Sequence, residues 1–165
     1  MKRDVIIIVV ICVLAIGIGA VLYVMGVENN APRAQEAAVS FSVIAEGANA
    51  SLSERKNFKI ENREQLEQVW ALAYGQTTVA LPSVDFEKYE VLAVFGGQKN
   101  TGGYTVAVKE IMDNEDTRRI TITHTVPGSS CVTTQALTSP FQFVRVEKSE
   151  ARIDRKDEIL TVACD

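Results

Sequence analysis

The sequence predicts an α+β protein, in which an N-terminal transmembrane helix precedes a mainly antiparallel β-sheet domain with one main amphipathic helix. Three observations support this prediction. Residues 5–27 form an uncharged apolar run, a single stretch between Asn62 and Gly75 has helical periodicity, and much of the remaining chain alternates apolar and polar residues. A chain of 165 residues has room for one ordinary domain beyond such a helix.

The apolar run over residues 5–27 consists mainly of Ile, Val, Leu, Ala and Gly. At about 1.5 Å per residue, a helix of this length crosses a hydrocarbon layer of about 30 Å. Lys2 and Arg3 precede the run and Glu28 follows it, so the positive-inside rule places the N-terminus in the cytoplasm and the C-terminal domain outside. A cleaved signal peptide has a shorter apolar region, and Cys12 lacks the small preceding residue that lipoprotein processing needs. We expect an uncleaved single-pass anchor in the cell membrane.

The expected organisation is a membrane anchor over residues 1–27, a linker over 28–38 and an extracytoplasmic β-rich domain over 39–165. The linker is polar and alanine-rich and contains Pro32, which suits a tether. The whole chain has 17 basic and 21 acidic residues, and removing the three charged residues before the anchor leaves a net charge of about −5. Nucleic acid is therefore not an expected partner, because its binding needs clustered cations.

Two cysteines, Cys131 and Cys164, lie in the part of the chain expected outside the cytoplasm, where disulfides persist. A bond between them would add about 3 to 4 kcal/mol of stability in the chain-entropy model. Two unpaired thiols remain the alternative, because a sequence does not show whether the two Cα atoms approach each other.

The first elements of the domain are two strands and the helix. Val39, Phe41 and Val43 alternate with serines as in a half-buried strand, and a weaker strand ends at Ile60. Asn62 is placed to cap a helix, and Gly75 is placed to end it. The apolar stripe of this helix comprises Leu66, Val69, Trp70, Ala73 and Tyr74.

The chain after Pro82 reads as strands almost to its end. Residues 91–95 are apolar on both faces, which predicts a central strand between the helix and another layer. Residues 104–109 and 120–126 alternate, with a polar turn at 113–116 between them. In the segment 141–148 the two phenylalanines face one way and the two valines the other, so we expect either a bulge or two partly exposed rings. A last strand is expected around Ile159, Leu160 and Val162.

The usual chemistry of a small enzyme is missing from the sequence. His124 is the only histidine and shares a strand face with Ile120 and Ile122, which is typical of a hydrogen-bonded core or edge residue. The segment 126–131 contains two serines and Cys131 but lacks the Gly-x-Ser-x-Gly pattern of a nucleophile elbow. The sequence has no zinc or calcium pattern either. We therefore expect no catalytic residues, no metal site and no cofactor.

A glycine-rich connection, residues 96–104, joins two of the predicted strands. Its spacing matches neither a phosphate-binding loop nor a dinucleotide fingerprint, and no helix follows it. Either a tight structural hairpin or an exposed binding loop on a rigid sheet fits this composition.

Several of these segments together resemble the C-terminal domain of the PrcB family. The resemblance rests on Val84-Asp85-Phe86 before the 91–95 strand, on Gly97-x-Lys99-x-Thr101-Gly102-Gly103-Tyr104, on Pro127, and on the run from Thr138-Ser139-Pro140 to Val146. With the preceding helix it covers roughly residues 58–148. The family is named after a subunit of a surface protease complex that associates with the protease, so the resemblance implies an accessory, protease-binding role.

A fainter resemblance points to chagasin-type protease inhibitors, small β-sandwiches that insert loops into cysteine-protease clefts. Their Asn-Pro-Thr-Thr-Gly-Tyr loop is similar to Asn100-Thr101-Gly102-Gly103-Tyr104, which lacks the proline and has glycine for the second threonine. Both resemblances imply recognition through loops.

We therefore predict a non-enzymatic protein-binding module whose partner is a protease. The alternatives are a direct protease inhibitor and a structural protein of the cell envelope. Glycines 102 and 103 are expected to shape the loop, Tyr104 to anchor the partner, and the two phenylalanines to add apolar contact. The predicted partner-binding residues are Lys99, Asn100, Thr101, Gly102, Gly103, Tyr104, Pro127, Gly128, Ser139, Pro140, Phe141 and Phe143.

Overall fold

The computed structural model describes residues 36–75 and 79–164. The predicted membrane helix at 5–27 and most of the predicted linker lie outside these ranges. No helix within the described ranges has the length and hydropathy needed to cross a membrane. The described residues belong to one compact unit, Glu36–Asp165. This unit begins slightly earlier than predicted, because Ala37–Ala38 at the end of the expected linker form a short strand, β1, that pairs with Met112 and Asp113.

The described residues of this unit form one helix and two four-stranded sheets. The first sheet has the order β1-β5-β6-β8 and the second the order β2-β7-β4-β3. The strands after β1 are β2 (Phe41–Gly47), β3 (Arg55–Ile60), β4 (Tyr89–Gly96), β5 (Thr105–Asp113), β6 (Thr117–Pro127), β7 (Phe141–Glu147) and β8 (Arg152–Val162), and the helix is α2 (Arg63–Tyr74). The β-rich fold with one helix agrees with the prediction, whereas the division into two sheets was not predicted.

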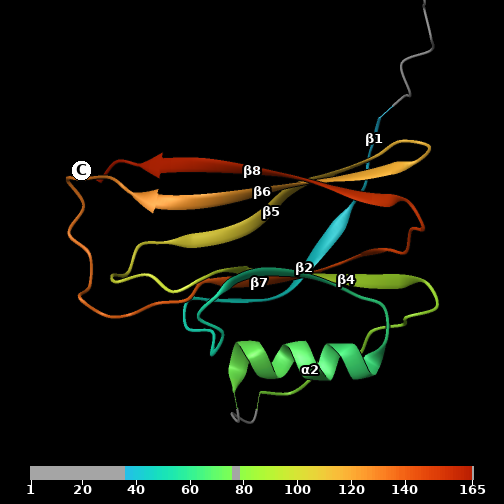
Figure 1. The fold of residues 1–165 in the computed structure, drawn as a ribbon, viewed down its shortest axis with the longest axis horizontal. Coiled ribbons are helices and arrows are strands. Elements are labelled where there is room, and N and C mark those ends of the chain that lie inside the picture. Colours follow the sequence, from blue (N-terminus) through green and yellow to red (C-terminus); the bar gives the residue numbers. More distant parts are fainter. Residues whose placement is uncertain (1–35, 76–78, 165) are drawn as a thin grey trace, which may run out of the picture. The chain divides into compact units, whose positions relative to one another are not determined.

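The two sheets pack face to face, and α2 covers the outer face of the β2-β7-β4-β3 sheet (Figure 1). Two apolar clusters fill the spaces between these layers. One lies between α2 and its sheet and includes Trp70, Phe95 and Phe143. The other lies between the sheets and includes Val94 and Ile122. The structure is therefore a helix–sheet–sheet arrangement rather than one sheet with a helix on it.

Helix α2 begins and ends where the sequence predicts. Asn62 Oδ1 accepts a hydrogen bond from the Gln65 backbone N–H at 2.9 Å, and Gln65 Oε1 accepts one from the Glu61 N–H at 2.8 Å. Gly75 ends the helix with φ 62° and donates its N–H to Ala71 O at 2.8 Å. These bonds satisfy backbone groups that a helix end otherwise leaves unpaired.

Strand β4 is central, as its apolar composition predicts. Val91 and Phe95 face the helix, while Leu92 and Val94 face the other sheet. The next strand in the sheet, β7, has the same arrangement: Phe143 packs under α2 and Val144 packs between the sheets. Burial on both faces explains why both strands lack the alternation of a half-buried strand.

Most neighbouring strands pair antiparallel, with one exception that the sequence did not predict. Strand β8 runs parallel to β6 over its full length, from Arg152 opposite Thr117 to Val162 opposite Pro127. The other pairs, including the β5–β6 hairpin, are antiparallel. Strand β8 is the last strand of its sheet, beyond β6, and so forms its edge.

Candidate functional site

The glycine-rich connection between β4 and β5 crosses from one sheet to the other and is tied to the segment that precedes β7. Lys99 and Thr138 exchange two backbone hydrogen bonds, at 2.7 and 3.0 Å. Thr138 Oγ1 donates to Thr101 O at 2.8 Å, and the Gly102 N–H donates to Thr134 O at 3.0 Å. The loop is therefore held in one conformation by a neighbouring segment rather than projecting alone.

Two of the predicted loop glycines are needed for this close packing. Gly103 has φ 86°, and a Cβ there would lie 3.2 Å from Pro127 Cβ. A Cβ on Gly102 would collide with Thr134 Oγ1. Valine at either position would disturb the loop's own packing, so variants of exposed side chains are better tests of binding.

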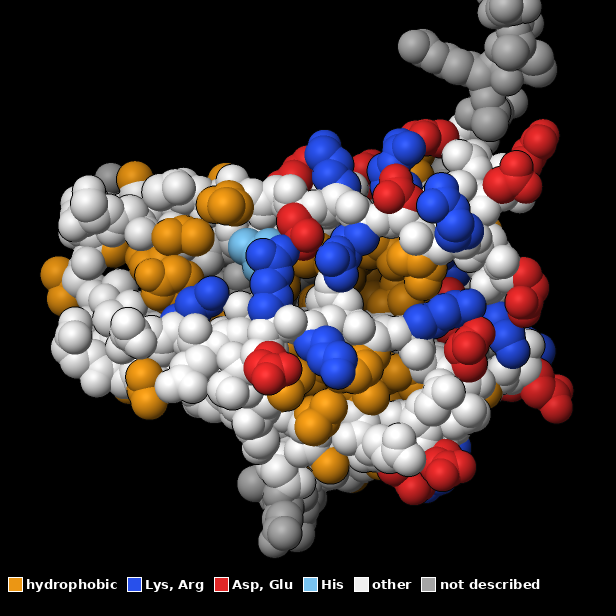
Figure 2. Space-filling model, viewed as in Figure 1, with side chains coloured by type: hydrophobic (Ala, Val, Ile, Leu, Met, Phe, Trp, Pro, Cys, Tyr) orange, Lys and Arg blue, Asp and Glu red, His pale blue; other side chains and the backbone are white. Residues whose placement is uncertain are grey.

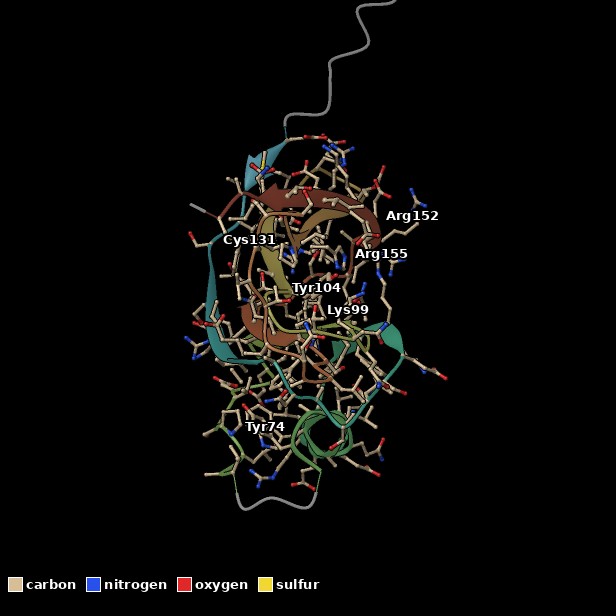
Figure 3. The ribbon with its side chains drawn as sticks, turned by 90° about the vertical axis from the view of Figure 1, so that its left-hand side faces the viewer. Tyr74, Lys99, Tyr104, Cys131, Arg152 and Arg155 are labelled. Carbon is tan, nitrogen blue, oxygen red and sulfur yellow. A yellow bond between two sulfur atoms is a disulfide. The ribbon has the colours of Figure 1, made fainter. Side chains whose placement is uncertain are left out.

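The predicted partner-binding residues gather at one end of the sandwich, but they differ in exposure. Asn100 and Gly103 are exposed, and Lys99 and Tyr104 are partly exposed. Pro127, the last residue of β6, and Gly128, which follows it, are also partly exposed. Figure 3 views the molecule from this end and labels Lys99 and Tyr104. The loop and the end of β6 thus form one accessible surface.

Five of the predicted contact residues, Gly102 and four in the segment that leads into β7, are buried, so their side chains are not accessible for direct contact with a partner. Ser139 Oγ donates to Leu52 O at 2.6 Å, and Pro140 is buried beside it. Phe141 and Phe143 are only 3% and 0% exposed. Both rings lie in the aromatic cluster under α2, because the strand that carries them is covered on both faces.

A small pocket lies beside the accessible loop residues. Its volume is about 140 Å³, and Lys99 and Tyr104 of the loop form part of its wall. The Lys99 ammonium lies 5.7 Å from the centre of the Tyr104 ring, within the range of a cation–π contact. Arg55, His124 and Ile159, from three different strands, are among its other lining residues.

His124 is part of a polar network between the two sheets at this pocket. Its Nε2 lies 2.8 Å from Arg55 Nη2, and Asp157 Oδ1 lies 3.1 Å from the same nitrogen and 2.7 Å from Arg55 Nη2. Burial lowers the pKa of His124, and the charges of Arg55 and Lys99 act in the same direction. A neutral ring accepts the Arg55 hydrogen bond at Nε2, which places its proton on Nδ1.

The segment after β6 is also joined to the end of β8. Cys131 and Cys164, the candidate disulfide pair, are bonded in the structure, with 4.9 Å between their Cα atoms. The Gly128 N–H donates to Val162 O at 2.8 Å beside the disulfide. These links hold the Pro127–Gly128 turn against the last strand.

Residues 91–147 match the family model described as PrcB C-terminal. The predicted PrcB resemblance is confirmed. No curated protein and no solved structure matches the chain.

The PrcB C-terminal match begins in β4 and ends with β7. It contains the whole Lys99–Tyr104 loop, the Pro127–Gly128 turn and the segment that ties the loop down. Helix α2 and strands β3 and β8 lie outside it, although the predicted resemblance extended to residue 58.

Sequence reasoning missed two of the residues that border the PrcB-like loop. Arg55 and Ile159 belong to β3 and β8, outside the matched segment, and only the fold brings them beside Lys99. Their sequence neighbours carry no motif that would reveal this proximity. In the described part of the chain, no three His, Cys, Asp or Glu side chains are grouped as metal ligands would be.

Proposed function

We propose that this chain is a non-enzymatic, protein-binding accessory subunit of a protease. The observation that carries the proposal is the PrcB C-terminal match over residues 91–147, which contains the complete Lys99–Tyr104 loop. That loop is braced by backbone hydrogen bonds and leaves Lys99, Asn100 and Tyr104 accessible to a partner. A rigid loop with accessible cationic and aromatic side chains suits protein recognition, because little order has to be created on binding.

The proposal places this subunit outside the cytoplasm, anchored by residues 5–27. The uncharged length of that segment and the basic residues before it support this location. The bond between Cys131 and Cys164 agrees with an oxidising compartment. The partner would then be a secreted or membrane-bound protease that meets the loop end of the domain.

Affinity capture from the native membrane tests this function. The full-length tagged protein is expected to retain a protease, identified by labelling with an active-site-directed probe, whereas the double variant Lys99→Glu with Tyr104→Ala is expected to lose it. Lys88→Glu is the matched control, because this exposed lysine precedes the opposite end of β4. Absence of any labelled protease with the unaltered protein would refute the accessory role, and a structural envelope protein would then be the better description.

A direct inhibitor is the second candidate, favoured by the gathering of the β4–β5 loop and the β6–β7 connection at one end of a two-sheet sandwich. An inhibitor of the chagasin type would insert these loops into a protease cleft. The captured protease distinguishes the two roles: its activity on a peptide substrate falls on addition of the purified chain if the chain inhibits, and is maintained if the chain is an accessory subunit.

A further inference from the structure

A groove opens between the two sheets along one side of the sandwich, away from the loop end. It runs between β3 and β8, which are the last strands of their respective sheets. Its volume is about 360 Å³. Engineered cavities of about 150 Å³ hold a benzene-sized group, so this groove has room for two aliphatic side chains.

The bottom of the groove consists of residues that otherwise belong to the core between the sheets. Leu92, Val94, Ile120 and Ile122 line it and are almost fully buried. Ile153 of β8 lies at the mouth and is 36% exposed. Figure 2 shows hydrophobic side chains at the bottom of a hollow that is flanked by Lys and Arg side chains. An apolar ligand group placed here would extend the existing core.

The two charged residues that line the groove, Lys59 and Arg155, are both cationic. Arg55 and Arg155 share a single carboxylate, that of Asp157, at 2.7 and 3.5 Å. Lys59 is already paired with two glutamates. The positive charge of these lining residues is opposite in sign to the net charge of the whole chain, which is −4.

Strand β8 also offers an unpaired backbone edge. It is 11 residues long, is exposed along nearly its whole length, and pairs with β6 on one side only. In a parallel pair, every second residue directs its N–H and C=O away from the neighbour, so β8 presents a row of free donors and acceptors. Such an edge can pair with an extended segment of another protein.

We propose that the β3–β8 groove binds an extended segment of a partner protein, which pairs with the edge of β8 and directs apolar side chains with flanking acidic side chains into the groove. The inference rests on the proposed function, because it defines the kind of segment that the protein partner supplies. It places this contact on a surface separate from the Lys99–Tyr104 loop.

The alternation of β8 determines which side chains of the added segment meet the groove. Ile153, Arg155 and Asp157 face the opposite sheet, whereas Asp154 faces outward and approaches Arg119 at 3.5 Å. Neighbouring strands place paired side chains on the same face of a sheet. Every second residue of the added segment therefore faces the groove, where apolar groups meet Ile153 and acidic groups meet the arginines.

A synthetic peptide tests the inference with the full-length protein in neutral detergent. The probe is the fluorescently labelled heptapeptide Glu-Thr-Val-Thr-Val-Thr-Glu, whose Glu and Val residues share one face of a strand. Fluorescence anisotropy is expected to show saturable binding. Ile153→Asp and Arg155→Glu are each expected to weaken it by about tenfold or more, which corresponds to losing one good contact. Val43→Asp is the matched control, because Val43 is 48% exposed on β2, the opposite edge of the same sandwich.

Two further peptides test the mode of binding. One peptide carries N-methyl groups on its odd-numbered amides and the other on its even-numbered amides. Only every second N–H of an added strand points toward β8, so one of the two peptides is expected to lose binding and the other to keep it. Replacing both Glu residues by Lys is expected to weaken binding. Thermal melts of the variants show whether any loss reflects unfolding, and Arg155→Glu remains informative if Ile153→Asp does not fold.

Several outcomes would overturn the inference. These are absence of peptide binding and equal binding of both N-methylated peptides. In a parallel titration with laurate as an aliphatic probe, binding of laurate but not of the peptide would also overturn it. Self-association that Arg155→Glu disrupts, without peptide binding, would instead assign the groove to a second copy of the chain. The Lys99→Glu, Tyr104→Ala variant is expected to bind the peptide normally, so the groove and the loop function can fail independently.

Discussion

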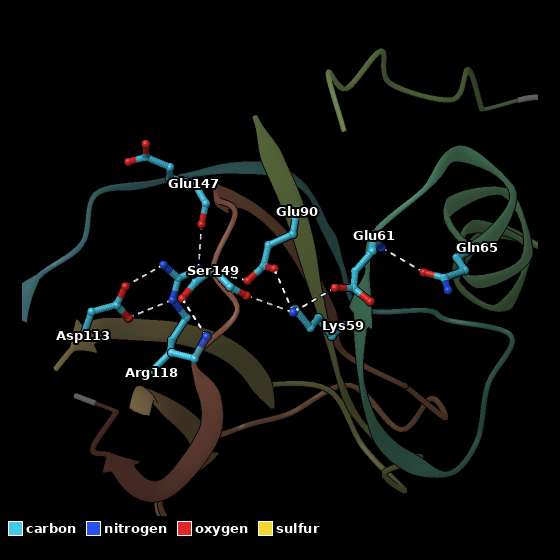
Figure 4. A network of polar contacts seen from close by, with 9 residues as sticks. Lys59, Glu61, Gln65, Glu90, Asp113, Arg118, Glu147 and Ser149 are labelled. Atoms are coloured by element: carbon cyan, nitrogen blue, oxygen red, sulfur yellow. Dashed lines mark hydrogen bonds and ion pairs between the residues drawn. The ribbon is translucent and has the colours of Figure 1, made fainter. Parts of the chain in front are cut away.

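Arg118 of β6 and Glu90 of β4 form a buried ion pair between the two sheets, with 2.9 Å between Nη1 and Oε1 (Figure 4). Glu90 has no exposed surface, and the Arg118 side chain is 3% exposed. The guanidinium also binds Asp113 through two nitrogens and Glu147 O at 2.6 Å. Because each charge has several partners, the cost of burying this pair is largely offset. Removing Arg118 leaves the fully buried Glu90 with Lys59, at 3.2 Å, as its remaining cationic partner.

Arg118→Met is therefore expected to lower the free energy of unfolding by about 3 to 5 kcal/mol, the usual cost of removing one partner of a buried ion pair. Arg119→Met is the matched control, because the neighbouring Arg119 is 40% exposed and its ion pairs should contribute less than about 1 kcal/mol. Urea unfolding followed by Trp70 fluorescence measures both. Equal losses in the two variants would show that the buried ion pair of Arg118 contributes no more stability than the exposed ion pairs of Arg119.

Gln142 is expected to stabilise an irregularity in the opposite sheet. The register of β5 against β6 shifts between Val108 and Glu110, and Gln142 Oε1 accepts the Val108 backbone N–H at 2.8 Å. Gln142→Leu would leave this buried donor unpaired and is expected to cost about 1 to 3 kcal/mol. Gln68→Leu on the exposed face of α2 serves as control. A loss below about 0.5 kcal/mol in chemical denaturation would show that water or a shifted backbone satisfies the amide.

The sequence was most informative where structure depends on local interactions. The cap at Asn62 and the stop at Gly75 are set by neighbouring residues, and both are confirmed. The segment 91–95 is apolar on both faces, and this local composition predicted a strand between two layers. Applied to Phe141 and Phe143, this interpretation would have predicted buried rings. The two alternatives considered, a bulge and partial exposure, both overlooked a second covered strand.

Features that depend on distant parts of the chain had no recognisable pattern. Most of β8 is polar and exposed because it is an edge strand, so only its apolar end indicated a strand. The contacts of His124 with Arg55 and Asp157 span 69 and 33 residues. Only the pairing of strands brings such residues together. The connection between β4 and β5 was therefore recognisable from its glycines, whereas the pocket beside it was not.

The neutral His124 is expected to make stability depend on pH. Its folded-state pKa is lowered from 6.5 by burial, so the unfolded chain binds this proton more readily. The stability that the neutral ring contributes is fully present above about pH 6.5. It is lost as the pH falls from there to the folded-state pKa of His124. The pKa of Asp157 is also lowered, and this residue affects the stability only at more acidic pH, below its ordinary pKa of 3.8.

Unfolding free energies measured between pH 7.5 and pH 5 test this effect. The unaltered protein is expected to lose more stability across this interval than His124→Asn, which keeps a polar group but does not titrate. Parallel curves for the two proteins would show that His124 is protonated equally easily in the folded and unfolded states.

The disulfide is expected to contribute stability mainly by restricting the unfolded chain. Cys131 and Cys164 are separated by 33 residues, and closing a loop of this size adds about 3 to 4 kcal/mol in the chain-entropy model. The double variant Cys131→Ser with Cys164→Ser is expected to lose this amount in urea unfolding. Addition of dithiothreitol should destabilise the unaltered protein but leave the double variant unchanged, which separates loss of the bond from other effects of the substitutions.

The same bond reports on the compartment in which the domain folds. Alkylation of free thiols in intact cells, followed by mass spectrometry, is expected to leave Cys131 and Cys164 unmodified in protein from its native host. Because cytosolic thiols are kept reduced, modification of both residues would contradict the proposed location outside the cytoplasm. Purified protein treated with dithiothreitol before alkylation provides the control, since both cysteines should then be modified.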